Sequence, residues 1–579
     1  MHRNLKRIWP YLWKYRRGWA IGLSSLALKD VTGALLPLVV RYAIDALTSG
    51  RKLQVIAGFA LLLIAVSLVK GFFQYWMRLI LVGISRDVEY DIRNDLFQRL
   101  VTLSPSYFAR NQTGDIMARS TNDLNAVRMM LGPGVMYWTE TSLTFILAIG
   151  IMVWIDWRLA FLALLPAPLV SFNVIFFGRK IHTRFQKIQE MFSDISSRVQ
   201  ENLSGVRMVR AFAQEDAEIQ RFEKLNQSYI AQNLRLARLQ GTFEPLLEGL
   251  IGLTFVAVLW AGGRQVLEHR ISLGSFVMFN TYMSILVWPM IALGWVVNLM
   301  QRGTASLTRI LEIMDQTPAI AGPPDPVRPG EIRGDIEFEN IIVNYPAGRA
   351  LGPLDLKIRA GTTVAIVGRT GSGKSTLVNL IPRLLDPDSG VVRLDGVDLR
   401  RFDLQDLRAQ IGMVPQETFL FSATIAENIA FGAEHASREE VERAAELAGL
   451  ESDIAGFPNG FETMVGERGL TLSGGQKQRT AIARALVLKP RILILDDALS
   501  SVDTLTEDRI LTGLAHVVAG RTVILISHRV STVRSADEII VLDKGRIVER
   551  GKHEELIACA GYYADLAQKQ TLEEELEAI

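Results

Sequence analysis

The sequence predicts a multi-domain protein in which an α-helical membrane domain precedes a soluble α/β domain. Long apolar runs fill residues 19 to about 302, whereas the chain after residue 331 has the mixed composition of a soluble domain. Between them, DQTPAIAGPPDPVRPGEIRG at 315–334 is rich in Pro and Gly and has no periodicity, which is typical of a domain boundary. A chain of 579 residues is long enough for both domains.

The overall charge argues against one class of partner. The chain carries 63 basic and 61 acidic residues, a net charge of +2, so electrostatics give no support for binding to nucleic acid. The single cysteine, Cys559, excludes an intramolecular disulfide. The first apolar segment is too long for a cleavable signal peptide and lacks a small-residue cleavage site, so we expect it to be retained.

Six apolar segments have the length of about 20 residues that a helix needs to cross a bilayer. A buried helix of a soluble protein is the alternative for any one segment, but six segments with such short gaps favour a membrane domain. We place the spans at Trp19–Tyr42, Val55–Leu81, Gly134–Ile155, Trp157–Gly178, Leu246–Leu267 and Leu273–Met300.

Basic residues flanking the spans predict their orientation. The N-terminal segment 1–18 is rich in Arg and Lys, and no acidic residue precedes Asp30, which places this segment in the cytosol. The two inner connections, near 85–131 and 179–243, are long, whereas the outer ones are short. Apolar residues recur every three or four positions from Ile181 to Phe212, which predicts that spans four and five continue into the cytosol as rigid helices. A helical bundle without any role in transmission would give the same stripe.

Ionisable residues also occur within the predicted spans. A charge in hydrocarbon is costly unless it faces a polar cavity or a partner, so we interpret these residues as lining a water-filled path or pairing between helices. Extension of the side chain toward the membrane surface explains Arg78 and Glu244 equally well. The residues are Lys29, Asp30, Lys70, Glu140, Glu244 and Glu248.

The strongest motif of the second half is GRTGSGKST, which fits G-x-x-x-x-G-K-[ST]. It lies between a predicted buried strand, TTVAIVG, and a predicted helix, TLVNLIPRLL. Backbone N–H groups of such a loop wrap a phosphate chain at a helix N-terminus, the lysine reaches the terminal phosphates and the hydroxyl ligates Mg²⁺. The motif therefore predicts an ATP and Mg²⁺ site on Gly368, Arg369, Thr370, Gly371, Ser372, Gly373, Lys374, Ser375 and Thr376.

The fold class that follows is a six-helix α transmembrane domain and then an α/β P-loop nucleotide-binding domain. Two further buried strands of the second half end in polar residues. RILILD ends at Asp496, which is suited to hold Mg²⁺ and is followed by Asp497. TVILISH ends at His528, at the edge of a parallel sheet where nucleotide sites form. A histidine packed in the core is the alternative for His528.

LSGGQKQR, at 472–479, closely resembles the signature of the ATP-binding cassette family when taken together with the P-loop. TGDIMARSTND, at 113–123, and VRMVRAFAQEDAEIQRF, at 206–222, resemble the two cytoplasmic loops of exporter-type half-transporters. The resemblance covers nearly the whole chain and implies an ABC exporter half-transporter of the type IV fold, similar to multidrug and lipid exporters. The implied segments are a basic N-terminus 1–18, a transmembrane domain 19–302, a linker 303–334, a nucleotide-binding domain 335–570 and an acidic tail 571–579.

The resemblance also implies roles for single residues. Tyr345 corresponds to the aromatic residue that stacks on adenine. Gln416, in VPQE, corresponds to the glutamine that contacts Mg²⁺ and the attacking water, and His528 to the histidine that contacts the γ-phosphate. Asp503 resembles the D-loop aspartate, and TMVGERG, at 463–469, resembles the exporter-specific loop. Coupling helices are implied near Asn111–Arg119 and Gln214–Arg221.

In the family, ATP is held between the P-loop of one cassette and the signature of another. This chain has one of each, so the resemblance implies a dimer with a second half-transporter and two composite sites. The signature residues that would serve the nucleotide held by the partner are Ser473, Gly474, Gly475 and Gln476.

Asp497 occupies the position at which the family usually has a catalytic glutamate. Aspartate is one methylene shorter, which leaves its carboxylate ~1.5 Å short of the glutamate position. Because a misplacement of about 1 Å can cost on the order of 100-fold in rate, we expect the site on this P-loop to bind ATP and hydrolyse it slowly. The leading hypothesis is a heterodimer with one slow and one fast site. The alternative is a homodimer in which a bridging water compensates for the shorter side chain.

The predicted function is ATP-driven export from an integral membrane protein, in the bacterial inner or plasma membrane, with its nucleotide-binding domain in the cytoplasm. Drugs, lipids and peptides of amphipathic character fit the aromatic and Met residues of spans five and six equally well. Packing between helices explains these residues just as well. The membrane lipids and a small amphipathic substrate are therefore the expected partners besides the second half-transporter. A soluble cassette acting on ribosomes or DNA conflicts with the six spans. An ATP-gated channel or regulatory subunit remains an alternative class.

Overall fold

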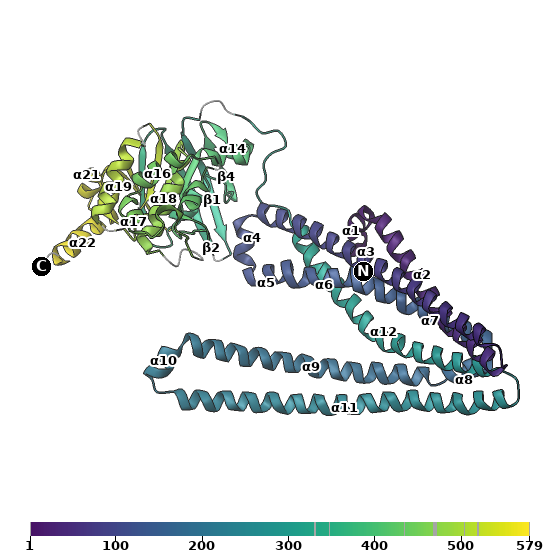
Figure 1. Ribbon diagram of the computed structural model, residues 1–579. Helices are drawn as coiled ribbons and strands as arrows, with labels where there is room; N and C mark the ends of the chain where they lie inside the picture. Colours follow the sequence, from purple (N-terminus) through teal and green to yellow (C-terminus); the bar gives the residue numbers. More distant parts are fainter. Residues whose placement is uncertain are drawn as a thin grey trace. The chain divides into compact units, whose positions relative to one another are not determined.

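The structure is a computed structural model that describes residues 2–328, 332–346, 348–433, 435–466, 472–502, 504–517 and 520–577. The chain forms two compact units (Figure 1). The first consists of Met1–Val101 with Gln112–Gln316, and the second of Thr102–Asn111 with Thr317–Ile579. Asp503 and residues 467–469 of the predicted exporter-specific loop lie outside the described residues.

Helices make up the first unit, and 6 stretches of the described chain are long and apolar enough to cross a membrane, as predicted. Four of these stretches are single helices and two are interrupted. The third contains two π-helical turns, and Pro166 separates the two helices of the fourth. The helices are α1 (His2–Lys14), α2 (Arg16–Thr48), α3 (Leu53–Thr102), α5 (Thr113–Ala118), η1 (Arg119–Asp123), α6 (Leu124–Met129), η2 (Met130–Gly134), α7 (Val135–Ile155), α8 (Trp157–Leu164), α9 (Ala167–Ser204), α10 (Val206–Ala211), α11 (Glu215–Leu267) and α12 (Leu273–Met314).

Two carboxylates organise the outer turns between these helices. The Asp156 Oδ1 atom accepts hydrogen bonds of 2.8 Å from the backbone N–H groups of Arg158 and Leu159, which caps α8 directly after α7 ends. Asp45, near the end of α2, accepts a hydrogen bond of 2.9 Å from the Ser272 hydroxyl and another of 2.9 Å from the Gly274 N–H group. The second carboxylate therefore joins the outer end of α2 to the start of α12.

The charged residues predicted inside the spans include an ion-paired group. Lys29 Nζ lies 2.8 Å from Asp30 Oδ1 on the same helix and 2.5 Å from Glu140 Oε1 on α7. Lys70 of α3 lines the same cavity of about 210 Å³, which Tyr282 of α12 also borders. The predicted pairing between helices is thus confirmed for Lys29 and Glu140, whereas Glu244 and Glu248 are exposed on α11.

The predicted cytosolic stripe does not run along one uninterrupted helix. Helix α9 ends at Ser204, and Gly205 separates it from the short α10. Helices α9 and α11 pack along one another (Figure 1). Of the stripe residues, Ile188 is 3% exposed, but Phe185, Phe192 and Phe212 are 49%, 53% and 71% exposed. Within this chain most of the stripe is therefore uncovered surface.

The two short helices at the cytoplasmic turns lie elsewhere than the resemblance implied. They are α4 (Pro105–Arg110), which belongs to the second unit, and α10. The implied stretch Asn111–Arg119 is instead the start of the third long stretch, and most of Gln214–Arg221 is the first part of α11. The positions of these two helices have a local cause. Pro105 at a first helical position starts α4, and Gly205 ends α9 directly before α10.

The linker region differs from the prediction in its length. Helix α12 continues through Met314, so residues 303–314 of the segment predicted as linker are helical. The non-helical connection begins where the Pro- and Gly-rich composition begins, at Asp315. At the other end, α22 (Tyr562–Glu577) continues into residues predicted as an acidic tail.

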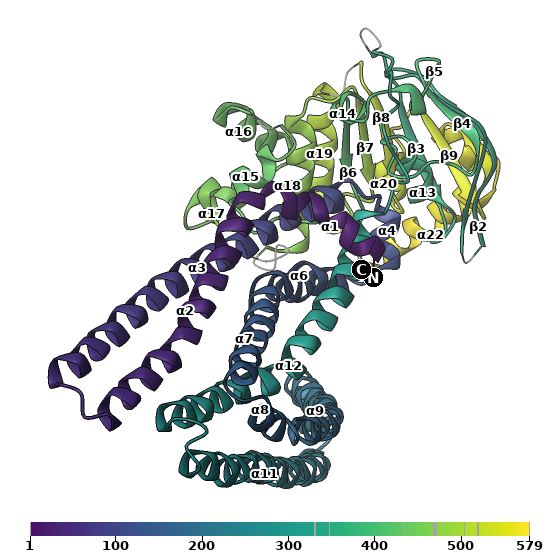
Figure 2. The ribbon, with the colours of Figure 1, turned by 90° about the vertical axis from the view of Figure 1, so that its right-hand side faces the viewer.

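The second unit contains two sheets. A four-stranded antiparallel sheet has the order β2-β1-β4-β5, and a six-stranded sheet has the order β10-β9-β3-β8-β7-β6. Strands β9, β3, β8, β7 and β6 are parallel, with β10 antiparallel at the edge. Figure 2 shows the central strands side by side. The bounds are β1 (Ile336–Tyr345), β2 (Gly348–Ile358), β3 (Thr363–Gly368), β4 (Ser389–Leu394), β5 (Val397–Asp398), β6 (Ile411–Val414), β7 (Ile492–Asp496), β8 (Thr522–Ile526), β9 (Glu538–Asp543) and β10 (Arg546–Gly551).

The parallel sheet is buried on both faces, which is why its strands read as continuous apolar runs. Alternate residues of β3 belong to different cores: Ala365 and Val367 pack with the helices, and Val364 and Ile366 pack toward the antiparallel sheet. The helices are α13 (Lys374–Asn379), η3 (Leu399–Arg401), α14 (Leu404–Ala409), α15 (Ile425–Ala430), α16 (Arg438–Leu447), α17 (Glu451–Gly456), η4 (Gly460–Glu462), α18 (Gly474–Val487), α19 (Thr504–Val517), α20 (Val530–Val533), α21 (His553–Ala558) and α22.

Candidate functional site

The topology of the parallel sheet brings four predicted site segments to one edge. Strands β3, β8, β7 and β6 are neighbours and run in the same direction, so their carboxyl ends meet. The P-loop follows β3, and His528 follows β8. Asp496 is the last residue of β7, and Gln416 follows β6. Residues far apart in the sequence thereby face one place.

The glycines of the P-loop are required by its backbone. Gly371 and Gly373 have φ angles of +81° and +102°, in the left-handed region that favours glycine. A Cβ atom at Gly368 would lie 2.1 Å from the carbonyl oxygen of Leu542, and one at Gly373 would lie 2.7 Å from that of Ala350. The loop can therefore wrap tightly ahead of α13 only with these glycines.

A cavity of about 300 Å³ lies at this edge of the sheet. It unites most of the predicted site residues and adds two that the motifs did not indicate, Ala350 and Ile526. Both are small or apolar wall residues, so no chemical signal in the sequence marks them. The lining residues are Tyr345, Ala350, Thr370, Gly371, Ser372, Gly373, Lys374, Ser375, Thr376, Gln416, Asp496, Asp497, Ile526 and His528. Tyr345 is 46% exposed, which leaves it accessible for stacking.

The Lys374 side chain folds over the start of the P-loop. Its Nζ atom donates hydrogen bonds of 2.8 Å to the Gly368 carbonyl and 3.1 Å to the Arg369 carbonyl. Burial lowers the pKa of Lys374, while the nearby carboxylates of Asp496 and Asp497 act in the opposite direction. A buried cation at a helix N-terminus, with glycine-rich backbone around it, is suited to an anion such as a phosphate chain.

Asp496 and Ser375 provide the oxygen atoms that a hard divalent cation prefers. Ser375 and Asp496 come from different elements, and both line the cavity. Burial raises the pKa of Asp496, and the neighbouring Asp497 raises it further, whereas Ser375, Lys374 and His528 lower it. One carboxylate and one hydroxyl fit Mg²⁺, which binds proteins through few ligands and completes its shell with phosphate and water.

Asp497 adopts a conformation that is uncommon for residues other than glycine. Its φ angle is +50°, and its N–H group donates a hydrogen bond of 2.9 Å to the Ile526 carbonyl of the next strand. Aspartate is one of the residue types that tolerate this left-handed region best. The turn therefore fixes the backbone of Asp497 at the strand end, and its reach into the cavity is set by the length of the side chain.

Known proteins identify the family. Residues 19–290 match the ABC transporter transmembrane region, and residues 351–500 match the ABC transporter domain. The chain is 37% identical to the probable multidrug resistance ABC transporter ATP-binding/permease protein YheI of Bacillus subtilis, over 99% of this chain and 98% of that protein. This protein is an ABC transporter.

Other relatives are similar over almost the full length. The multidrug resistance-like ATP-binding protein MdlA of Escherichia coli is 37% identical, over 98% of this chain and 97% of MdlA. The ATP-dependent lipid A-core flippase of Syntrophus aciditrophicus is 36% identical, over 96% of this chain and 93% of the flippase. A solved structure of a bacterial Atm1-family ABC exporter with ATP bound has a TM-score of 0.79 and 30% identity, covering 96% of this chain and 98% of that one.

These similarities, together with the six apolar helices, establish the general activity. The transporter is a multi-pass protein of the plasma membrane with a cytoplasmic ATP-binding domain, and it couples ATP hydrolysis to export. Exporters of this family work as dimers, so a chain with one membrane domain and one ATP-binding domain needs a partner.

The predicted signature residues do not line the P-loop cavity of their own transporter chain. Ser473 caps α18, because its hydroxyl accepts a hydrogen bond of 3.3 Å from the Gln476 N–H group and its N–H group donates one of 2.9 Å to Gln476 Oε1. Asp453 holds the same helix through Gln476, at 3.1 Å, and Arg479, at 2.6 Å. The signature turn is therefore held in a defined conformation by these contacts, and its first residues do not line that cavity.

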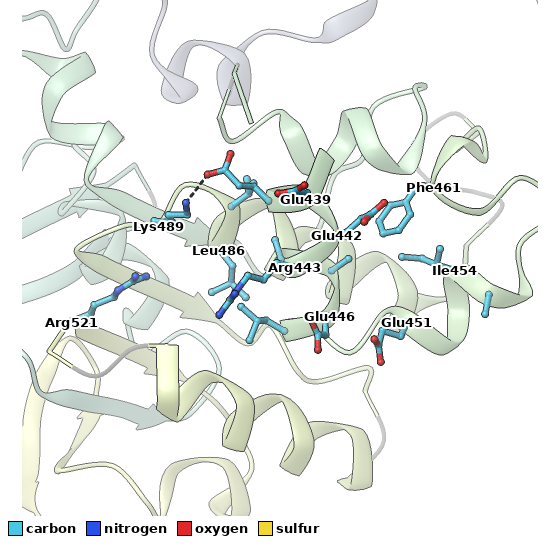
Figure 3. Close-up of a pocket in the computed structure, with 16 residues that line it drawn as sticks. Glu439, Glu442, Arg443, Glu446, Glu451, Ile454, Phe461, Leu486, Lys489 and Arg521 are labelled. Atoms are coloured by element: carbon cyan, nitrogen blue, oxygen red, sulfur yellow. Dashed lines mark hydrogen bonds and ion pairs between the residues drawn. The ribbon is translucent and has the colours of Figure 1, made fainter. Parts of the chain in front are cut away.

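A larger hollow elsewhere in this domain does not suit a nucleotide. It lies over α16 and α17, and Figure 3 shows several carboxylates along it, with an ion pair of 2.6 Å between Lys489 and Glu440. The acidic side chains would repel a triphosphate, although Arg443 and Arg521 also border the hollow. The carboxylates are those of Glu439, Glu440, Glu442, Glu446 and Glu451.

Proposed function

We propose that the transporter exports amphipathic solutes as one half of a heterodimer in which the P-loop site of this chain hydrolyses ATP slowly. The observation that carries the proposal is Asp497. It directly follows Asp496, the last residue of β7, and lines the P-loop cavity, but its carboxylate has the shorter aspartate reach. The substrate class is supported by the relatives, whose names state multidrug resistance and lipid A-core flippase functions.

The roles that we assign follow from the cavity. Tyr345 stacks on the base, and residues 370–376 hold the phosphates, with Lys374 as the buried cation. Ser375, Asp496 and Gln416 supply the ligands for Mg²⁺, and the ion would neutralise phosphate charge in the transition state. His528, at the end of β8, contacts the terminal phosphate. Asp497 orients the attacking water.

The signature of this chain completes the partner's site. Ser473 and the N-terminus of α18 are structured but lie away from the chain's own P-loop cavity, which supports service to another nucleotide. In the heterodimer the partner supplies a glutamate at that other site, which is the fast one. A homodimer is the second candidate, and the intact signature capping favours it as much as it favours the heterodimer.

One assay separates these candidates. The full-length chain is purified alone in lipid nanodiscs, and its steady-state ATP turnover is measured. The same turnover is measured for the Asp497→Asn variant and for the native complex, which is the chain isolated from native membranes together with its bound partner. We expect little turnover for the chain alone and much more for the native complex. Robust turnover of the chain alone that Asp497→Asn abolishes would establish the homodimer and contradict the slow site.

Export is tested by transport against a gradient. Inside-out vesicles containing the native complex should accumulate a fluorescent amphipathic dye above the external concentration when ATP and Mg²⁺ are supplied. Equilibration without accumulation would indicate a channel, because a channel cannot move solute uphill. Vesicles supplied with Mg²⁺ but no ATP serve as the control.

A further inference from the structure

The C-terminal helix α22 contacts the loop that carries His528. The Gln570 side chain accepts a hydrogen bond of 2.7 Å from the Val530 N–H group and donates one of 2.6 Å to the His528 carbonyl. One amide group thus holds the backbone on both sides of the loop that leads from β8 into α20. Neither Gln570 nor α22 lines the nucleotide cavity, and no sequence motif indicated either of them.

Helix α22 is itself fixed at its start. Glu549 of β10 accepts hydrogen bonds of 2.5 and 3.2 Å from the N–H groups of Tyr562 and Tyr563, which places a carboxylate at the helix N-terminus. Tyr563 is 0% exposed, packs in the core with the parallel sheet, and its hydroxyl is hydrogen-bonded to His553 at 2.8 Å. The position of Gln570 along the helix is therefore set by rigid contacts two turns earlier.

The same helix also contacts the P-loop. The guanidinium of Arg369 lies over the ring of Tyr562, with 5.5 Å from its Cζ atom to the ring centroid. The loop that carries His528 is also held on its other side, where Arg529 donates hydrogen bonds of 3.0 and 3.2 Å to the carbonyls of Val502 and Ser500. His528 is thus held between α22 and the turn that follows Asp497.

We propose that Gln570 is a positioning residue for His528, and that α22 fixes the histidine relative to the P-loop for ATP hydrolysis. The imidazole is exposed at the cavity edge, so its orientation depends on the backbone that carries it. Loss of either hydrogen bond to Gln570 would let that backbone shift, and displacements of about 1 Å at a reacting group can cost on the order of 100-fold in rate. This inference rests on the proposed contact of His528 with the terminal phosphate.

The experiment uses the full-length chain with its native partner in nanodiscs, and single-turnover hydrolysis of radiolabelled ATP, which also measures a slow site. Gln570→Ala should lower the hydrolysis rate about tenfold and leave the ATP concentration for half-saturation within about twofold. Glutamate has the same shape as glutamine, but in Gln570→Glu an ionised carboxylate would face the His528 carbonyl. This variant should therefore lower the hydrolysis rate by as much as Gln570→Ala. Gln568→Ala, at an exposed glutamine of the same helix, should change neither quantity.

Two further readouts separate positioning from a general loss of structure. In a His528→Ala background, Gln570→Ala should have no added effect on the rate, because the residue acts through the histidine. Hydrogen exchange of the peptide around Val530 should speed up in Gln570→Ala while the melting temperature stays close to that of the unaltered protein. A rate loss that adds to His528→Ala, or unchanged hydrolysis in both Gln570 variants, would overturn the proposal. Unchanged hydrolysis in His528→Ala would instead overturn the proposed role of the histidine, and this inference with it.

Discussion

The P-loop edge and the signature turn are two regions of one domain with opposite character. At the P-loop edge, residues from four strands converge on one cavity, and Lys374 and Asp496 are buried there. The signature turn caps its own helix through Ser473 and Gln476 and contributes nothing to that cavity. The first region can bind a ligand within one chain, whereas we propose that the second region contacts a nucleotide held by another chain. The difference explains why this family functions as dimers.

The largest effect is expected from a substitution at the P-loop edge. Lys374→Ala removes the buried cation, and we expect both nucleotide affinity and ATP hydrolysis at this chain's own P-loop site to fall, with that hydrolysis reduced on the order of 100-fold or more. Binding of a fluorescent ATP analogue and release of phosphate measure the two quantities. Lys489→Ala is the matched control, because this lysine forms a surface ion pair in the same domain. Retained nucleotide affinity in Lys374→Ala would contradict the assigned cavity.

The signature side should fail in a different way. Gly474→Asp places a carboxylate at the start of α18, where the partner's phosphate would lie, so turnover should fall by roughly 100-fold while the affinity of this chain's own P-loop for ATP stays unchanged. A Cβ atom at Gly474 would lie 3.3 Å from that of Ser501, which requires only a small adjustment.

Gly456→Asp is the control for that substitution, because a Cβ atom there has nothing within 4 Å. A parallel loss of nucleotide affinity in Gly474→Asp would mean that the signature turn and the P-loop of one chain serve the same nucleotide.

A smaller effect is expected from a substitution of Asp497, which also lies at the P-loop edge. Asp497→Glu extends the carboxylate by one methylene, so ATP hydrolysis at this chain's own P-loop site should rise roughly tenfold. Nucleotide affinity should not change, because the residue acts on the water. Single-turnover hydrolysis provides the measurement. An unchanged rate would show that reach does not limit this site.

The smallest expected effect concerns the support of the signature helix. Asp453→Ala removes the carboxylate that holds Gln476 and Arg479, so the free energy of unfolding of the domain should fall by about 2 kcal/mol. Turnover should drop only a few-fold, and nucleotide affinity should stay constant. Thermal unfolding monitored together with ATP binding tests this. Asp508→Ala, on exposed surface of α19, is a suitable control.

Local sequence patterns predicted more of the nucleotide site than of the membrane domain. The structure places Thr370 to Thr376, Asp496 and His528 at one cavity, as predicted from their positions at or just after the ends of buried parallel strands. Ala350, Ile526 and Gln570 could not be found this way, because their contribution depends on contacts between segments far apart in the chain. In the membrane half, charges within spans predicted pairing, and Lys29 and Glu140 do pair. Helix ends were predicted least well, since single residues such as Gly205 decide them.

The central claim is that the P-loop cavity and the signature turn of different chains close on one nucleotide. The most direct measurement places a photoreactive amino acid at Ser473 of the full-length chain in native membranes, with irradiation in the presence and absence of ATP. Mass spectrometry of the cross-linked peptides should identify a P-loop peptide of a second chain, joined to Ser473 only when ATP is bound. Cross-links confined to the same chain, or no ATP-dependent cross-link at all, would contradict the account.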